Sequence, residues 1–195
     1  DLTRLMIETN QWPLRPQLGE SWSPAPTTQD GLALNAADPM ESGKSLKLVE
    51  DMIAGLMSYD QKSLSSMGMK RFWAPQFQWY GPGGIGSARG HDDYERAHQG
   101  PFLKAFPDRI GGNHKCRIGE STYVASTGWP SLNATHFGDD WIGLPATGNR
   151  ITQRIMDFWR REDDMLVENW VFIDMVDLIS QFGIDLLPDH KRETK

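Results

Sequence analysis

The sequence contains a single cysteine, Cys116, among 195 residues. One cysteine cannot form an internal disulfide or a multi-cysteine metal site, and it fits a reducing compartment. The five histidines are isolated, with no His-x-His or His-x-x-x-His pair, and no G-x-S-x-G nucleophile motif occurs. We therefore expect a cytoplasmic protein without a bound metal and without serine-nucleophile chemistry.

The chain also lacks an excess of positive charge and a long apolar run. Its 20 basic residues are scattered and outnumbered by 26 acidic ones, which gives no electrostatic footprint for nucleic acid. No stretch approaches the length of a membrane span, so we expect no membrane partner. With 38% hydrophobic residues the chain can form one ordinary domain. Its eight tryptophans and nine methionines indicate an apolar pocket or an oligomer interface, or simply a well-filled core.

Residues 1–42 do not look like a domain. Five prolines interrupt any helix or central strand, while large apolar residues such as Trp12, Leu14, Leu18 and Trp22 make the segment too apolar for a free linker. We predict an extended arm packed on a surface, with a disordered tail as the alternative. The folded domain then spans residues 43–190.

The remaining pattern places helices before strands. Apolar spacing of three and four residues begins after Ser45, a plausible N-cap, and recurs in 60–67, 91–106 and 174–182. Strand patterns follow one another in the second half of the chain, after one brief strand at 77–80. They cover 113–118, 121–129 with a continuation at 133–137, and a long hairpin of 149–160 with 166–174. This order predicts an α+β fold in which helices cover one face of a curved antiparallel sheet.

A glycine-rich stretch follows the first strand. Gly81, Gly83 and Gly86 make a literal G-x-G-x-x-G, but Pro82 interrupts the turn and the next helix begins only near His91. A dinucleotide site needs that helix directly after the turn. We therefore predict a wide loop at the mouth of the fold.

The last strand ends in a carboxylate. Alternation along a strand puts Glu168, Trp170, Phe172 and Asp174 on one side of it. An acid at the end of a strand lined by aromatic residues can be desolvated, which raises its pKa toward that of a useful proton carrier. We predict Asp174 as a general acid/base, with an N-cap role for the final helix as the alternative.

Several motifs together carry a family resemblance. They are Gly81-Pro82-Gly83-Gly84-Ile85-Gly86, Pro101-Phe102 with Phe106-Pro107-Asp108, Gly143-Leu144-Pro145-Ala146-Thr147-Gly148, and Glu168-Asn169-Trp170 with Asp174 and Gln181. From about residue 45 to 187 the chain resembles the SnoaL-like polyketide cyclases of the nuclear transport factor 2-like superfamily. The resemblance implies a cone-shaped α+β fold around an apolar pocket and a cofactor-free aldol cyclase in which Asp174 is the general acid/base.

These considerations define a predicted site and its partners. The catalytic candidates are Asp174, His136 and His98, and the substrate-binding candidates are Trp79, His91, Trp141, Trp170 and Phe172. We expect Asp174 to border a cavity walled by Trp170, Phe172 and Trp79. The ligand is expected to be small and apolar or aromatic, polyketide-like by resemblance, with no cofactor and with a homodimer as the assembly.

Two other classes of function remain open. An epoxide hydrolase or hydratase would need an Asp-Arg-Asp network, to which Asp157 and Arg154 could contribute. Their opposite strand parity points them to opposite faces, which disfavours this reading. A non-catalytic ligand-binding or dimerisation module is favoured if Asp174 is engaged in capping and no cavity lies beside it.

Overall fold

The computed structural model describes residues 2–28, 35–111, 114–138 and 141–187. Six strands form one sheet in the order β2-β1-β6-β5-β4-β3. The strands are β1 (Trp73–Tyr80), β2 (Ala88–Arg89), β3 (Cys116–Glu120), β4 (Tyr123–Thr135), β5 (Arg150–Glu162) and β6 (Met165–Ile173). The helices are α1 (Leu2–Glu8), α2 (Pro39–Met57), the 3₁₀ turns η1 (Leu64–Met67) and η2 (Met69–Arg71), α3 (Gly90–Tyr94), the π-helix η3 (Glu95–Gln99), α4 (Gly100–Ala105) and α5 (Met175–Gln181).

The sheet pairing is antiparallel except at one place. The predicted long hairpin is confirmed as β5 and β6, with Phe158 opposite Trp170, and β4 and β3 continue the antiparallel order. The early strand β1 is parallel to β6, the last strand of the chain. This pairing follows from the intervening helices and strands, which provide the long crossover that a parallel pair requires.

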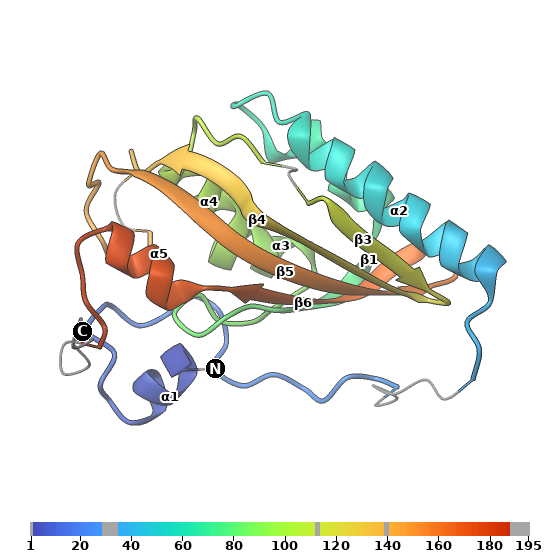
Figure 1. Ribbon diagram of the computed structural model, residues 1–195, viewed down its shortest axis with the longest axis horizontal. Helices are drawn as coiled ribbons and strands as arrows, with labels where there is room; N and C mark the ends of the chain where they lie inside the picture. Colours follow the sequence, from blue (N-terminus) through green and yellow to red (C-terminus); the bar gives the residue numbers. More distant parts are fainter. Residues whose placement is uncertain (1, 29–34, 112–113, 139–140, 188–195) are drawn as a thin grey trace, which may run out of the picture.

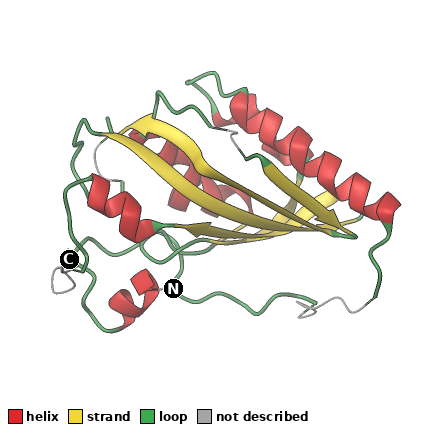
Figure 2. Cartoon of the chain, viewed as in Figure 1, coloured by secondary structure: helices red, strands yellow, loops and turns green. Residues whose placement is uncertain are grey.

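The helices α2, α3 and α4 cover one face of the sheet, which we call the inner face (Figure 1, Figure 2). Along β5 the side chains of Ile151, Gln153 and Trp159 are buried on this face, while Arg154 and Met156 point to the opposite, outer face. Figure 1 shows α2 and α1 on opposite sides of the sheet. Within the described part of the chain, no helix is long and apolar enough to cross a membrane.

The start of α2 differs from the predicted N-cap at Ser45. Asp38 is the cap, and its Oδ1 accepts hydrogen bonds from the amides of Met40 at 2.8 Å and Glu41 at 3.3 Å. Pro39 begins the helix, where its fixed φ and missing N–H are tolerated. Ser45 is instead buried between the helix and the sheet, where it donates to the Ser121 carbonyl at 2.7 Å and accepts from Arg161 Nε at 2.9 Å.

The N-terminal arm is packed but not fully extended, because it begins with α1. The Trp12 ring covers Gly84 so closely that a Cβ atom placed on this glycine would lie 2.7 Å from the ring. The glycine loop therefore lies beneath the arm and not at an open mouth of the fold. Further along the arm, the Thr27 amide donates to Glu168 Oε1 at 3.0 Å. Trp22, at 75% exposure, lies in solvent, contrary to the expected packing of that residue.

Deleting residues 1–37, which keeps the Asp38 cap, should destabilise the domain. The arm buries Met6 and half-buries Trp12, and each large apolar side chain contributes about 1.5–3 kcal/mol. The two side chains together contribute about 2–4 kcal/mol, which corresponds to a fall in melting temperature of roughly 5–15 °C for a chain of this length. Thermal unfolding followed by circular dichroism measures it. An unchanged melting temperature would show that the arm contributes nothing to stability.

Candidate functional site

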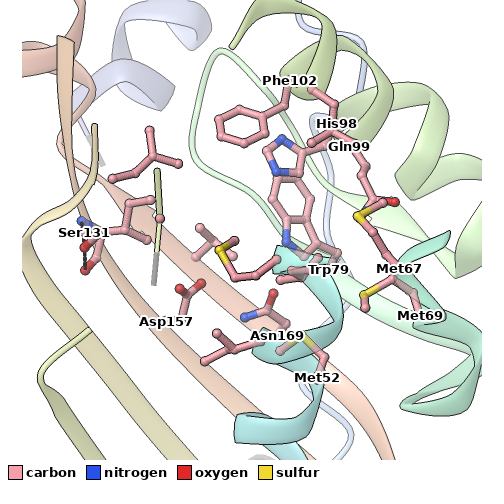
Figure 3. Close-up of a pocket in the computed structure, with 18 of the residues that line it drawn as sticks. Met52, Met67, Met69, Trp79, His98, Gln99, Phe102, Ser131, Asp157 and Asn169 are labelled. Carbon is pink, nitrogen blue, oxygen red and sulfur yellow. Dashed lines mark hydrogen bonds between the residues drawn. The ribbon is translucent and has the colours of Figure 1, made fainter. Parts of the chain in front are cut away.

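A cavity of about 170 Å³ lies between the inner face of the sheet and the helices that cover it (Figure 3). Most of its wall is apolar, from methionines and leucines of α2 and the turn after it and from aromatic residues of β1 and α4. The polar groups at the wall are few. They are Tyr94, His98, Gln99, Arg109, His114, Ser131, Gln153, Asp157 and Asn169. A mostly apolar cavity with a few polar groups is typical of a small-molecule site.

The central strand β5 supplies the most unusual of these groups. Its odd-numbered residues face inward, so Gln153, Ile155, Asp157 and Trp159 all line the cavity. Asp157 lies in the middle of the sheet, opposite Ser126 on β4 and Val171 on β6. Figure 3 shows its carboxyl group pointing into the cavity, near Asn169.

The environment of Asp157 favours its protonated form. Burial raises the pKa of Asp157 to about 7, and the neighbouring Asn169 amide opposes that rise only in part. Burial has this effect because a carboxylate loses its hydration in an apolar surrounding. No described Lys or Arg forms an ion pair with Asp157. The group can therefore exchange a proton near neutral pH.

A π-helical turn places His98 at the cavity. Such turns are frequent at functional sites. The turn η3 carries His98, which stacks on Trp79 with ring centroids 4.3 Å apart and an interplanar angle of 17°. Burial lowers the pKa of His98 to about 3, and its Nδ1 has no hydrogen-bond partner among the described residues. His98 is therefore a neutral hydrogen-bonding group and a poor base at neutral pH.

Tyr94 precedes this turn and supplies a hydroxyl group. Burial, with smaller contributions from the charges of Asp157 and Glu95, raises the pKa of Tyr94 above its ordinary range. The phenol therefore keeps its proton and can act as a hydrogen-bond donor in the cavity. Tyr94 and Asp157 both line this cavity.

Asp174 does not lie where the sequence predicted. It is the N-cap of α5, with Oδ1 accepting from the Asp177 amide at 3.0 Å and Oδ2 accepting from Arg154 at 3.2 Å. Its side chain is 38% exposed and belongs to a hollow on the outer face, together with residues of α1. The prediction that Asp174 borders the apolar cavity is therefore wrong. The capping alternative is the observed arrangement.

The other predicted site residues divide into three groups. Trp79 and His98 line the cavity. Trp170 and Phe172 are on the outer face, because they share the parity of Asp174 and not that of the inward Asn169 and Val171.

The third group is buried or lies elsewhere. His136 and Trp141 pack around Phe106 and Phe182 in an aromatic cluster outside the cavity wall, where Thr147 lies 3.2 Å from His136 Nδ1. His91 packs edge-on against Phe77 and lines a separate surface hollow. None of these side chains contacts the cavity with Asp157. In the described residues, no three His, Cys, Asp or Glu side chains come together as a metal-binding group.

Comparison with known proteins defines the class first. The solved structures that match include nuclear transport factor 2-like proteins from Burkholderia xenovorans and Burkholderia thailandensis, at TM-scores of 0.55 and 0.57. They are 14% and 19% identical to this chain, cover 72% of it in both cases, and are themselves covered over 96% and 97% of their length. The fold is therefore of the nuclear transport factor 2-like class, as predicted.

The family follows from the sequence. The profile of the SnoaL-like polyketide cyclases matches residues 59–182, and the chain belongs to that family. AclR from Streptomyces galilaeus, a candidate hydroxylase, is 27% identical over 73% of this chain and 86% of its own, with a TM-score of 0.55. IdmH from Streptomyces antibioticus, a candidate polyketide cyclase, is 23% identical over 69% of this chain and 98% of its own, with a TM-score of 0.53. No curated protein sequence matches the chain.

Proposed function

We propose that this protein is a cofactor-independent enzyme that moves a proton at a carbon next to a carbonyl, in an intramolecular aldol cyclisation of a polyketide-like ligand. Asp157 is the general acid/base, in place of Asp174. The observation that carries the proposal is a half-buried carboxyl group at the wall of a mostly apolar cavity, with no cationic partner among the described residues. Membership of the SnoaL-like polyketide cyclase family supports the reaction class.

The chemistry needs only groups that the cavity holds. The Asp157 carboxylate takes a proton from the carbon next to a substrate carbonyl, and the resulting enolate oxygen accepts a hydrogen bond from the Tyr94 hydroxyl. The enolate carbon then bonds to a second carbonyl carbon of the same molecule. The alkoxide that forms takes the proton back from Asp157. The carboxyl group returns to its starting state, and no electron acceptor is consumed.

Proton exchange with solvent tests this step without the natural substrate. The bicyclic ketone 2-tetralone in D₂O loses its α-hydrogen signals from the NMR spectrum as deuterium enters. We expect the protein to accelerate this exchange well above the rate in buffer, because a base with a pKa near 7 is partly ionised at neutral pH. Tight binding without acceleration would favour a non-catalytic ligand-binding module.

We further propose that the outer face of the sheet pairs with a second copy of the chain. Trp129, Met156 and Phe172 are 75%, 39% and 59% exposed on adjacent strands, and Met156 lies directly opposite Phe172. A two-fold dimer brings the same patch of both copies together. Arg154 and Asp174, which pair beside this patch, give it charges of both signs for a self-complementary contact.

Charge placed in this patch should separate the dimer. We expect Phe172→Glu to be monomeric by light scattering at micromolar concentration, while the wild-type protein is dimeric, because burying an unpaired carboxylate in an apolar contact is costly. Phe137→Glu is the control, since Phe137 is 56% exposed next to α4 and away from the patch. A monomeric wild-type protein would rule out the proposed assembly.

A further inference from the structure

The amide of Gln153 is the most unusual polar group of the cavity that the proposed mechanism does not use. Gln153 is 1% exposed and lines the cavity. Neither Nε2 nor Oε1 has a hydrogen-bond partner among the described residues.

The position of Gln153 in the sheet explains why its amide has no partner among the described residues. Strand β6 ends at Ile173, which pairs with Ile155 of β5. Gln153 lies two residues before Ile155 on β5, so it has no neighbour on β6. Its partner on the other side is Leu132, which has no polar side-chain atom to offer. An unpaired buried amide is costly to a fold, which favours a role in contacting a bound molecule.

We propose that Gln153 determines substrate specificity by pairing with a neutral ring system that carries a hydrogen-bond donor and an acceptor on adjacent atoms. A cyclic lactam has this arrangement, with its N–H directly beside its C=O. A primary amide is complementary to a lactam, since its N–H meets the acceptor and its C=O meets the donor. This inference rests on the proposed function, which places the reacting carbon of the ligand at Asp157.

Distance and volume limit the size of this ligand. Gln153 and Asp157 are four residues apart on one strand, so their Cα atoms are at most about 13 Å apart. A hydrogen bond of about 3 Å at each end leaves about 7 Å, the length of a bicyclic or small tricyclic ring system. The cavity of about 170 Å³ agrees with the smaller of these, since a cavity of about 150 Å³ holds benzene.

Three bicyclic probes of similar shape test the pairing. 2-Quinolone carries the adjacent donor and acceptor, N-methyl-2-quinolone lacks the donor, and quinoline lacks the pair without adding bulk. We expect wild-type protein to bind 2-quinolone about tenfold to a hundredfold more tightly than either control, measured by titration calorimetry, because two hydrogen bonds are formed in an apolar site. Equal affinity for the three probes would overturn the proposal.

Variants of Gln153 locate the preference. Gln153→Leu and Gln153→Met remove the amide at similar volume, and either one suffices if the other fails to fold. Both should lose the preference for 2-quinolone and should have melting temperatures no lower than that of the wild-type protein, because an unpaired amide is removed. A preference that persists in a folded variant, or a variant destabilised by loss of an internal amide contact, would contradict the assignment.

Asp157→Asn separates this inference from the proposed function. It should keep the preference for 2-quinolone, because binding at Gln153 needs no proton transfer at Asp157. If the preference is present and wild-type protein does not exchange the protons of 2-tetralone, the proposed function fails and the role of Gln153 stands. If exchange is present and the preference is absent, the role of Gln153 fails alone.

Discussion

Asp157→Asn should lower the rate of proton exchange at carbon by roughly two to four orders of magnitude, the usual contribution of a positioned general base. Asparagine keeps the shape of the side chain and removes the ionisable group, so binding of 2-tetralone should change little. The wild-type kcat/KM should rise with pH and level off above about 7, because the carboxylate is the active form and burial raises the pKa of Asp157 to about 7. Exchange rates from NMR over pH 5 to 9 measure both effects.

Asp174→Asn is the matched control for this experiment. It makes the same chemical change at the end of the neighbouring strand, and asparagine also caps helices well, so α5 should remain intact. Turnover should stay within about twofold of the wild-type rate, because Asp174 lies on the outer face beside Arg154. Loss of turnover in Asp174→Asn with normal turnover in Asp157→Asn would return the catalytic role to Asp174.

The fold could be predicted because the sequence patterns that indicate it are formed by neighbouring residues or are repeated in several motifs. The two long strands around the Asp163 turn make their hairpin from neighbouring residues, and β4 continues past Pro130 as the separated strand patterns indicated. The parallel pairing of β1 with β6 joins residues about ninety positions apart, and no local pattern reports such a contact. The α1 helix was missed because five prolines dominate the composition of the first 42 residues.

The site was harder to predict, since alternation separates the two faces of a strand without showing which face is inner. The parity of β6 was correct, but Trp170 and Phe172 are apolar enough to suggest a cavity wall and lie outside. On β5 the inward residues include Gln153 and Asp157, which look like solvent-facing positions in a sequence. Polar residues at inward positions of an apolar strand are expected at functional sites. Only the three-dimensional arrangement shows that Gln153 and Asp157 point inward.

Asp157→Asn should also make the protein more stable than the wild type above neutral pH. The pKa of Asp157 is about 7 in the folded chain and near its ordinary value of 3.8 in the unfolded chain, so the folded form binds more protons between these values. Ionisation of Asp157 therefore lowers the free energy of unfolding of the wild-type protein. This effect grows as pH rises from about 4 to 7 and is complete above 7. A pKa difference of this size corresponds to at most about 4 kcal/mol. Asparagine does not ionise and avoids that loss.

Urea unfolding of both proteins at several pH values measures this difference directly. Other carboxyl groups, such as Asp108, have a lowered pKa and make both proteins more stable as pH rises, so the difference between the two isolates Asp157. We expect the unfolding free energies to be similar at pH 4 and the variant to be more stable by up to a few kcal/mol at pH 8. A difference that is constant from pH 4 to pH 8 would show that Asp157 ionises normally in the folded protein, and it would remove the physical basis for its role as a proton carrier.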